Sequence, residues 1–199
     1  MHKFTNSELQ MQINNLTYEI KKDNKLLQNK DIVIFNSSVL PIKGTQNILI
    51  ASRGWFGNIR SWDGINFIVL SIFNNKFKKI KQNIIDIDIE LLRDKSIKFK
   101  EFKKKIILHE KVVLEGPEDP RLYYHNDKVY ILINELDYET LNTNNKPKRL
   151  IYVAELDLET LNYKTSKSVL CRLQSTSFEK NWGPFTHNNE LYMLYDINP

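Results

Sequence analysis

The residues most able to do chemistry lie in one short stretch, which reads Gly-Pro-Glu-Asp-Pro-Arg-Leu from Gly116 to Leu122. Two prolines, Pro117 and Pro120, bracket the adjacent carboxylates of Glu118 and Asp119. Each proline fixes its own φ, and the second also favours an extended backbone at the residue before it. We therefore expect Asp119 to be an extended, well-placed carboxylate at the mouth of a strand, positioned for hydrogen bonding or proton transfer.

Arg121 follows this pair, and an extended chain would place its side chain on the same face as Asp119. An acid and a cation would then share one surface. The plain alternative is a loop cap, in which Asp before Pro starts a turn and Arg121 forms an exposed ion pair of little energetic value.

The composition is that of an ordinary globular protein. The chain has 199 residues, of which 41% are hydrophobic and 27% are charged, enough for one core. Its single cysteine, Cys171, excludes an intramolecular disulfide framework. The polar N-terminus lacks the apolar core of a signal peptide, and no apolar run is as long as a membrane span. These features predict a cytoplasmic protein without a membrane partner.

The charge pattern argues against two further classes of partner. The formal net charge is +5, but the lysines are spread along the chain rather than gathered on a nucleic-acid-binding motif. The densest run, Lys98 to Lys105, is typical of a solvated hairpin or edge strand. His109, His125 and His187 lack the spacing of metal ligands. We therefore expect neither a nucleic-acid partner nor a bound metal.

The elements that must position these residues are predicted to be strands. Residues 1–30 form a polar arm or short helix, with apolar positions at helical spacing. From residue 31 onward, short runs rich in Ile, Val, Phe and Tyr alternate with turn residues, and only residues 84–92 show a helix-like pattern, which disfavours a parallel βαβ fold. The predicted strands are Ile32–Phe35, Ile48–Ala51, Phe67–Phe73, Ile106–Leu114, Leu122–Tyr124, Val129–Ile133, Leu150–Ala154, Val169–Leu173 and Leu191–Tyr195.

One unit of the chain recurs. Residues 125–132 match residues 187–194, an offset of 187 − 125 = 62 residues, and both copies predict a hairpin turn followed by a strand. A repeat of this kind predicts an all-β propeller of four-stranded antiparallel blades, although it is longer than the roughly 40 to 50 residues of familiar blades. Residues 31–199 would supply roughly three blades. Because a closed propeller has at least about four, a second chain or a C-terminal continuation would complete it.

The stretch at Glu118 to Arg121 resembles the Glu-Asp-Pro-Arg signature of the β-mannoside phosphorylases and hydrolases of glycoside hydrolase family 130, which are five-bladed β-propellers. Other segments resemble this family in the same order along residues 31–199. They are Phe35–Val39 with Asn47–Arg53, an Asn-x-Ser turn before a strand that ends in Arg, and Glu179–Phe185 with Leu191–Pro199. The resemblance is that of a divergent member, truncated if these residues are the whole protein.

The resemblance implies that Asp119 is the proton donor. A donor must be protonated near neutral pH, so its surroundings should be apolar or negatively charged, and Glu118 could supply that charge. Arg121 would then hold sugar or loop geometry. In these phosphorylases inorganic phosphate attacks the anomeric carbon with inversion, so phosphate would be a co-substrate, with Lys180 and Arg149 as its candidate ligands and no other cofactor.

The remaining candidates are sugar ligands. Asn36, Arg53, Glu118 and Asn181 could bind hydroxyl groups, as could Lys180, whose alternative is an ordinary surface lysine. Trp182 could stack on a pyranose ring, and its alternative is a place in the core of a blade.

Two functions follow from these residues, and binding of an acidic polyanion, suggested by the net positive charge, is a third and weaker alternative. The first is a glycosidase or inverting glycoside phosphorylase that acts on β-mannosides or related sugars. Hydrolysis would need a base, for which Asp157 and Asp196 are candidates. The second is a catalytically inactive propeller that binds an oligosaccharide or a protein.

Overall fold

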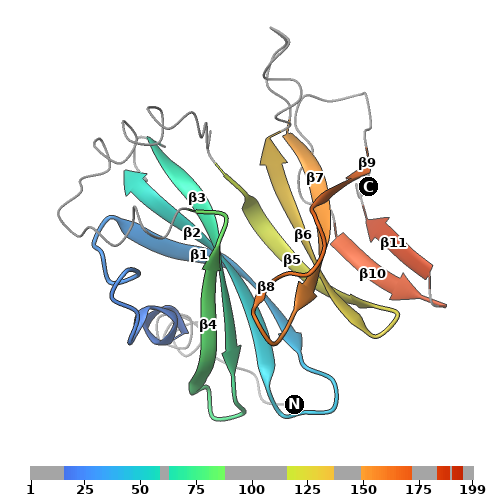
Figure 1. Cartoon of the computed structure of the whole chain (residues 1–199), viewed down its shortest axis with the longest axis horizontal. Coiled ribbons are helices and arrows are strands. Elements are labelled where there is room, and N and C mark those ends of the chain that lie inside the picture. Colours follow the sequence, from blue (N-terminus) through green and yellow to red (C-terminus); the bar gives the residue numbers. More distant parts are fainter. Residues whose placement is uncertain are drawn as a thin grey trace, which may run out of the picture.

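The computed structural model describes residues 16–58, 63–87, 116–136, 149–171, 183–188 and 190–194. These residues form two antiparallel sheets and a separate hairpin (Figure 1). The predicted all-β class is therefore confirmed.

The first sheet is a meander of four strands in chain order. Its strands are β1 (Ile32–Pro41), β2 (Ile48–Asn58), β3 (Asp63–Phe73) and β4 (Lys79–Ile85). The second sheet contains β5 (Glu118–His125), β6 (Lys128–Leu136), β7 (Arg149–Asp157), β8 (Asn162–Tyr163) and β9 (Ser168–Cys171), and both of the last two strands pair with β7. The hairpin consists of β10 (Gly183–His187) and β11 (Glu190–Leu194).

The two sheets pack face to face over a shared core. Leu49, Ile68 and Leu70 of the first sheet and Ile131 and Ile133 of the second belong to one apolar cluster and are almost fully buried. Burying a side chain of this size contributes about 1.5–3 kcal/mol. This core fixes the two sheets relative to each other and so brings β1 and β2 close to β5.

The outer face of the first sheet is covered by the N-terminal residues. Residues 16–21 form a short helix, and Ile20 and Leu27 pack on Ile34, Phe56 and other side chains of the sheet. The short helix at residues 16–21 lies within the segment 1–30 for which an arm or a short helix was predicted. Residues 1–15 lie outside the described part of the chain. Among the described residues, no helix has the length and apolar character needed to cross a membrane.

The predicted repeat is confirmed as a pair of equivalent hairpins. His125 pairs with Lys128 across the β5–β6 turn, and His187 pairs with Glu190 across the β10–β11 turn. Tyr123 stacks on Tyr130 with ring centroids 5.6 Å apart, and the residues 62 positions later, Phe185 and Tyr192, stack at 5.4 Å. The second hairpin packs on the outer face of the first through Leu191 and Met193.

Most of the predicted strands are present, and three strands, β4, β8 and β10, were missed. Strand β10 begins with Gly183 and Pro184, residue types that are depleted in strands. Each described run falls within a strand, while Ile106–Leu114, residues 172–173 and residue 195 lie outside the described residues. The helix-like pattern at residues 84–92 begins inside a strand, because Ile84 and Ile85 are the last residues of β4, and residues 88–92 lie outside the described residues. Strand β4 lacks a regular alternation of apolar and polar residues, and the two-residue strand β8 is too short to give a sequence signal.

Candidate functional site

The site is built on two matching β-bulges, one in each sheet. In β1, two residues between Phe35 and Ser38 lie opposite one residue of β2, and in β5 two residues between Glu118 and Arg121 lie opposite one residue of β6. The first residue in each bulge, Asn36 or Asp119, has a φ of +47°. Such bulges disrupt strand pairing locally and re-aim a side chain.

The left-handed backbone at Asp119 corrects the expectation of an extended conformation. Asp and Asn tolerate this region better than most residues. Pro120 fits because a bulged residue needs no N–H for the strand ladder. The preference that a proline imposes on its predecessor is outweighed here by the contacts of the Asp119 carboxylate with Asn36 and Arg53.

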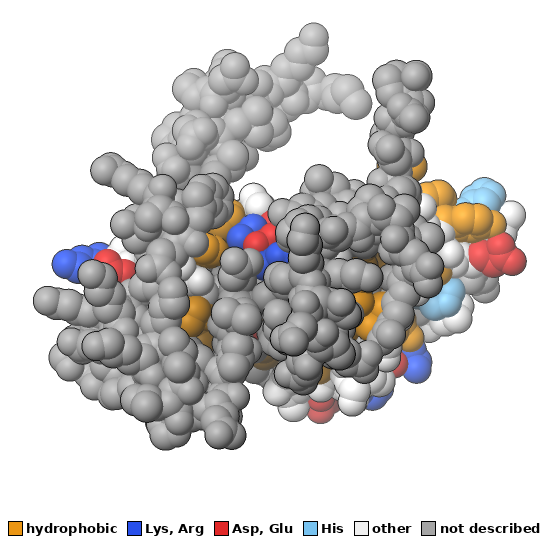
Figure 2. Space-filling model, turned by 90° about the horizontal axis from the view of Figure 1, so that it is seen from above, with side chains coloured by type: hydrophobic (Ala, Val, Ile, Leu, Met, Phe, Trp, Pro, Cys, Tyr) orange, Lys and Arg blue, Asp and Glu red, His pale blue; other side chains and the backbone are white. Residues whose placement is uncertain are grey.

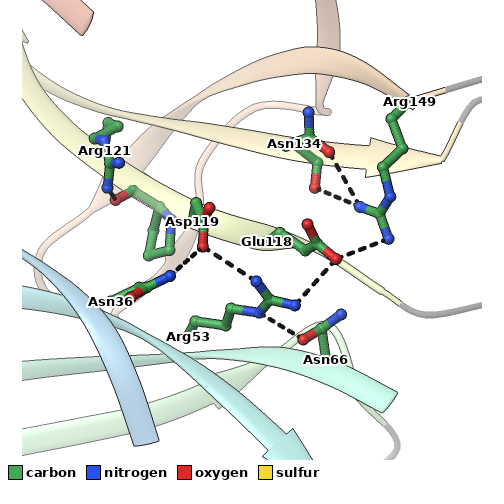
Figure 3. Close-up of polar contacts among 9 residues, drawn as sticks. Asn36, Arg53, Asn66, Glu118, Asp119, Arg121, Asn134 and Arg149 are labelled. Atoms are coloured by element: carbon green, nitrogen blue, oxygen red, sulfur yellow. Dashed lines mark hydrogen bonds and ion pairs between the residues drawn. The ribbon is translucent and has the colours of Figure 1, made fainter. Parts of the chain in front are cut away.

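These contacts join the two sheets (Figure 3). The Asn36 amide donates a hydrogen bond to Asp119 Oδ1 at 2.7 Å, and Arg53 Nη1 lies 3.2 Å from the same oxygen. Asn36 and Arg53 belong to β1 and β2, whereas Asp119 belongs to β5. The predicted sugar-binding pair and the predicted proton donor therefore do lie together, but they contact one another directly.

Arg53 is the central cation of the site. Its Nε donates to Asn66 Oδ1 at 2.7 Å, and its Nη2 lies 3.0 Å from Glu118 Oε1. The guanidinium also lies over the ring of Phe35, at 5.0 Å from the centroid. Only 6% of Arg53 is exposed. With contacts on three of its nitrogens and one face, this side chain is rigidly oriented.

Arg149 completes the network from the far side of Glu118. Its Nη2 lies 3.1 Å from Glu118 Oε1, and its Nη1 donates to Asn134 Oδ1 at 3.0 Å. Only 2% of this residue is exposed. We call the linked residues Asn36, Arg53, Asn66, Glu118, Asp119, Asn134 and Arg149 the Asp119 cluster. Arg149, predicted as a phosphate ligand, is thus a buried partner of Glu118.

The electrostatics keep Asp119 ionised. Burial raises the pKa of its carboxyl, but the hydrogen bond from Asn36 and the guanidinium of Arg53 outweigh this effect and hold that pKa below the usual value. Arg121 adds a smaller lowering of the same pKa. Its own side chain points away from the cluster and donates to Pro120 O at 3.3 Å, so the expected sharing of one face by Asp119 and Arg121 is not found (Figure 3).

Other predicted site residues are placed differently or not described. Lys180, Asn181, Trp182 and Asp196 lie outside the described residues. Asp157, a candidate base, accepts hydrogen bonds from the backbone N–H of Glu159 and the hydroxyl of Thr160, and so stabilises the turn after β7.

Asn66 and Asn134 were not predicted. Each is a lone amide in the middle of an apolar strand, and only its cross-strand and cross-sheet neighbours reveal its role.

The arrangement is suited to accepting hydrogen bonds from a ligand. Asp119 Oδ1 is fixed by its two partners, while the side chain as a whole is 25% exposed. Charged side chains of both signs also meet near the middle of the face shown in Figure 2. Among the described residues, no group of His, Cys, Asp and Glu side chains could hold a metal ion.

Comparisons with known proteins identify no relative whose function could be compared with this site. No family model matches the chain, and no curated protein or solved structure matches it.

Proposed function

We propose that this chain is a carbohydrate-active protein of the propeller type, which binds a glycoside at the Asp119 cluster. One observation carries the proposal. Asp119 has a strained left-handed backbone in a bulge, and its partly exposed carboxylate is oriented by residues of the neighbouring sheet. Strain of this kind costs about 1–3 kcal/mol and is found most often at functional sites.

The order of the strands supports the propeller part of the proposal. Each sheet is an antiparallel meander, and their first strands, β1 and β5, lie next to each other. The amide of Leu122 in β5 donates to Ser38 Oγ in β1, and Thr186 in β10 donates to the carbonyl of Tyr124 in β5. The first strands of three successive units are therefore neighbours, as they are around the axis of a propeller.

The chemistry of the cluster suits a polyol. An ionised carboxylate accepts hydrogen bonds from hydroxyl groups, and charged acceptors form stronger hydrogen bonds than neutral ones. Because the contacts of Arg53 and Asn36 orient the Asp119 carboxylate before any ligand arrives, little side-chain entropy is lost on binding. A neutral sugar with several hydroxyl groups is the ligand class that fits these features.

Glycosidic cleavage with Asp119 as general acid is the second candidate. The observation in its favour is geometric: the Asp119 carboxylate is partly exposed and oriented by Asn36 and Arg53, although its pKa in the absence of a ligand is lowered. A sugar that displaces water and loosens the contact with Arg53 would raise the pKa toward that of a proton donor. Hydrolysis and inverting phosphorolysis, on β-mannosides or related glycosides, both remain open under this candidate.

Replacing Asp119 by Asn tests both candidates. Binding of a panel of β-mannosides is measured by titration calorimetry, and products are sought with and without inorganic phosphate. We expect affinity to fall at least about tenfold, since hydrogen bonds to a charged group contribute about 1.5–3 kcal/mol. If the wild type cleaves the glycosides, turnover should fall by roughly two to four orders of magnitude.

Asp127→Asn is a matched control. Asp127 also has a positive φ, but its side chain is 88% exposed at the β5–β6 turn, so binding should be unchanged. Binding of none of the glycosides by the wild type, or equal affinity in the wild type and Asp119→Asn, would overturn the proposal.

A further inference from the structure

Glu118 uses one oxygen to join two arginines from different sheets. Its Oε1 lies 3.0 Å from Arg53 Nη2 and 3.1 Å from Arg149 Nη2. Arg53 comes from β2 and Arg149 from β7, and all three side chains are buried. Buried charges are tolerated when they are paired and hydrogen-bonded, so the bridge makes this arrangement of two guanidinium groups possible.

The same bridge determines where Arg53 points. One terminal nitrogen of Arg53 contacts Glu118, and the other contacts Asp119 Oδ1. The two neighbouring carboxylates therefore share one guanidinium, while Glu118 also receives Arg149. An oxygen that already accepts from two guanidinium groups is poorly suited to bind a ligand, in contrast to the expectation that Glu118 binds substrate.

We propose that Glu118 is a positioning residue, which holds Arg53 against Asp119 and divides the positive charge of Arg53 and Arg149 between the two carboxylates. The inference rests on the proposed function, since Asp119 is the residue that Glu118 serves. It assigns to Glu118 and Arg149 opposite influences on Asp119, although both belong to the same buried network.

The signs of these influences follow from charge. Neutralising Glu118 leaves the positive charges of Arg53 and Arg149 less compensated, so Asp119 should become a stronger acid. Neutralising Arg149 leaves Glu118 less compensated, so Asp119 should become a weaker acid. A merely structural role would lower stability in both variants without moving the pKa of Asp119 in opposite directions.

The groups that face Asp119 come from several elements. They are Asn36 from β1, Arg53 from β2, and Glu118 and Arg121 from β5, with Arg149 of β7 acting through Glu118. Glu118 forms ion pairs with Arg53 and with Arg149, and Arg53 in turn contacts Asp119. Changing Glu118 or Arg149 therefore tests an influence that passes through Arg53 and through space.

The test is a titration of Asp119 followed by the NMR signal of its side-chain carboxyl carbon, with Asp119→Asn used to assign the signal. Wild type, Glu118→Gln and Arg149→Gln are compared. We expect the pKa to fall by about 0.5 to 1 unit in Glu118→Gln and to rise by a similar amount in Arg149→Gln. Equal pKa values, or shifts of the same sign, would overturn the proposal.

A double variant keeps the test decisive if a single variant fails to fold. Glu118→Gln combined with Arg149→Gln removes one charge of each sign and leaves the charge balance of the cluster unchanged. The pKa of Asp119 should be lower in the double variant than in Arg149→Gln and higher than in Glu118→Gln, so whichever single variant folds supplies the comparison. The opposite difference, or no difference, would overturn the proposal. Circular dichroism of each variant monitors the strand content.

The titration needs no sugar, so its outcome is separate from that of the proposed function. If the signs are as expected and no glycoside binds, the role of Glu118 stands and the proposed function fails. If glycosides bind but the signs are not as expected, Glu118 is not the positioning residue. If glycosides bind and the pKa shifts have the expected signs, the pH midpoint of glycoside binding should follow the pKa of Asp119 from variant to variant.

Discussion

Replacing Asn36 by Asp would place a second carboxylate against Asp119. The Asn36 amide nitrogen lies 2.7 Å from Asp119 Oδ1, and the left-handed backbone of residue 36 accepts Asp as well as Asn. Two unit charges at this distance repel by about 6 kcal/mol at an effective dielectric constant of about 20. The partial exposure of Asp119 and the nearby Arg53 reduce this value. The pair should therefore share one proton, as closely spaced carboxylates do.

We expect the repulsion to raise the upper of the two pKa values of this carboxylate pair by about 2 to 3 units. This upper pKa would then lie well above the unfolded value of about 3.9. Stability gained from a raised pKa is present at low pH and is lost as pH rises through the folded pKa. Asn36→Asp should thus be about 3 kcal/mol less stable than wild type at about pH 7 and recover much of this loss near pH 4.

Wild-type Asp119 should behave in the opposite way. Its pKa is lowered in the folded state, so its contribution is present above the unfolded pKa and is lost as pH falls through the folded one. Urea unfolding followed by tryptophan fluorescence, repeated from about pH 2 to about pH 7, measures how stability changes with pH in the variant and in the wild type. Asn188→Asp is the control, because Asn188 is exposed and also has a positive φ. If Asn36→Asp showed the same pH dependence as this control, the contact between the two bulges would be refuted.

Two further substitutions, the first with a matched control, test other contacts in the structure. Gly116→Ala should lower the free energy of unfolding by more than about 2 kcal/mol, because a Cβ there would lie 2.2 Å from a backbone carbonyl oxygen at a φ of +62°. Gly44→Ala, at a φ of +72° with no atom within 4 Å, should cost only about 1 kcal/mol in the same urea assay. Lys167→Met removes the cation between the buried carboxylates of Asp86 and Glu135. It should lower the free energy of unfolding by about 3 kcal/mol at pH 7 in the same urea assay, because two buried carboxylates lose their cation.

The hairpins were predictable from the sequence because their signals are local. Asn126 and Asp127 are turn residues that tolerate a positive φ, and the structure gives them φ values of +48° and +59°. Two such central residues define a type I′ turn, whose twist matches that of the flanking strands. The same turn chemistry recurs at Asn188, so a comparison of the sequence with itself found both hairpins.

The site was only partly predictable, because its contacts join strands distant in sequence. Residue types at Asn36, Arg53 and Asp119 indicated polar groups that could act together, and these three side chains do meet. The predicted extended backbone at Asp119 was wrong. The rule for a residue before proline is local and cannot include the hydrogen bond that Asp119 accepts from Asn36, 83 positions away. The burial of Arg149 also escaped prediction, as it depends on the packing of β5 and β7 around Glu118.

The division of the cluster between two sheets links its formation to the packing of the core. Asn36 and Arg53 belong to the first sheet, whereas Glu118 and Asp119 belong to the second, and among the described strands no pairing connects the two sheets. Apolar packing around residues such as Leu70 and Ile131 holds the sheets together and is insensitive to small changes in direction. The ion pairs of Arg53 require specific distances and angles. The apolar core therefore supplies most of the free energy of docking, while the Asp119 cluster selects the one alignment in which the two bulges face each other.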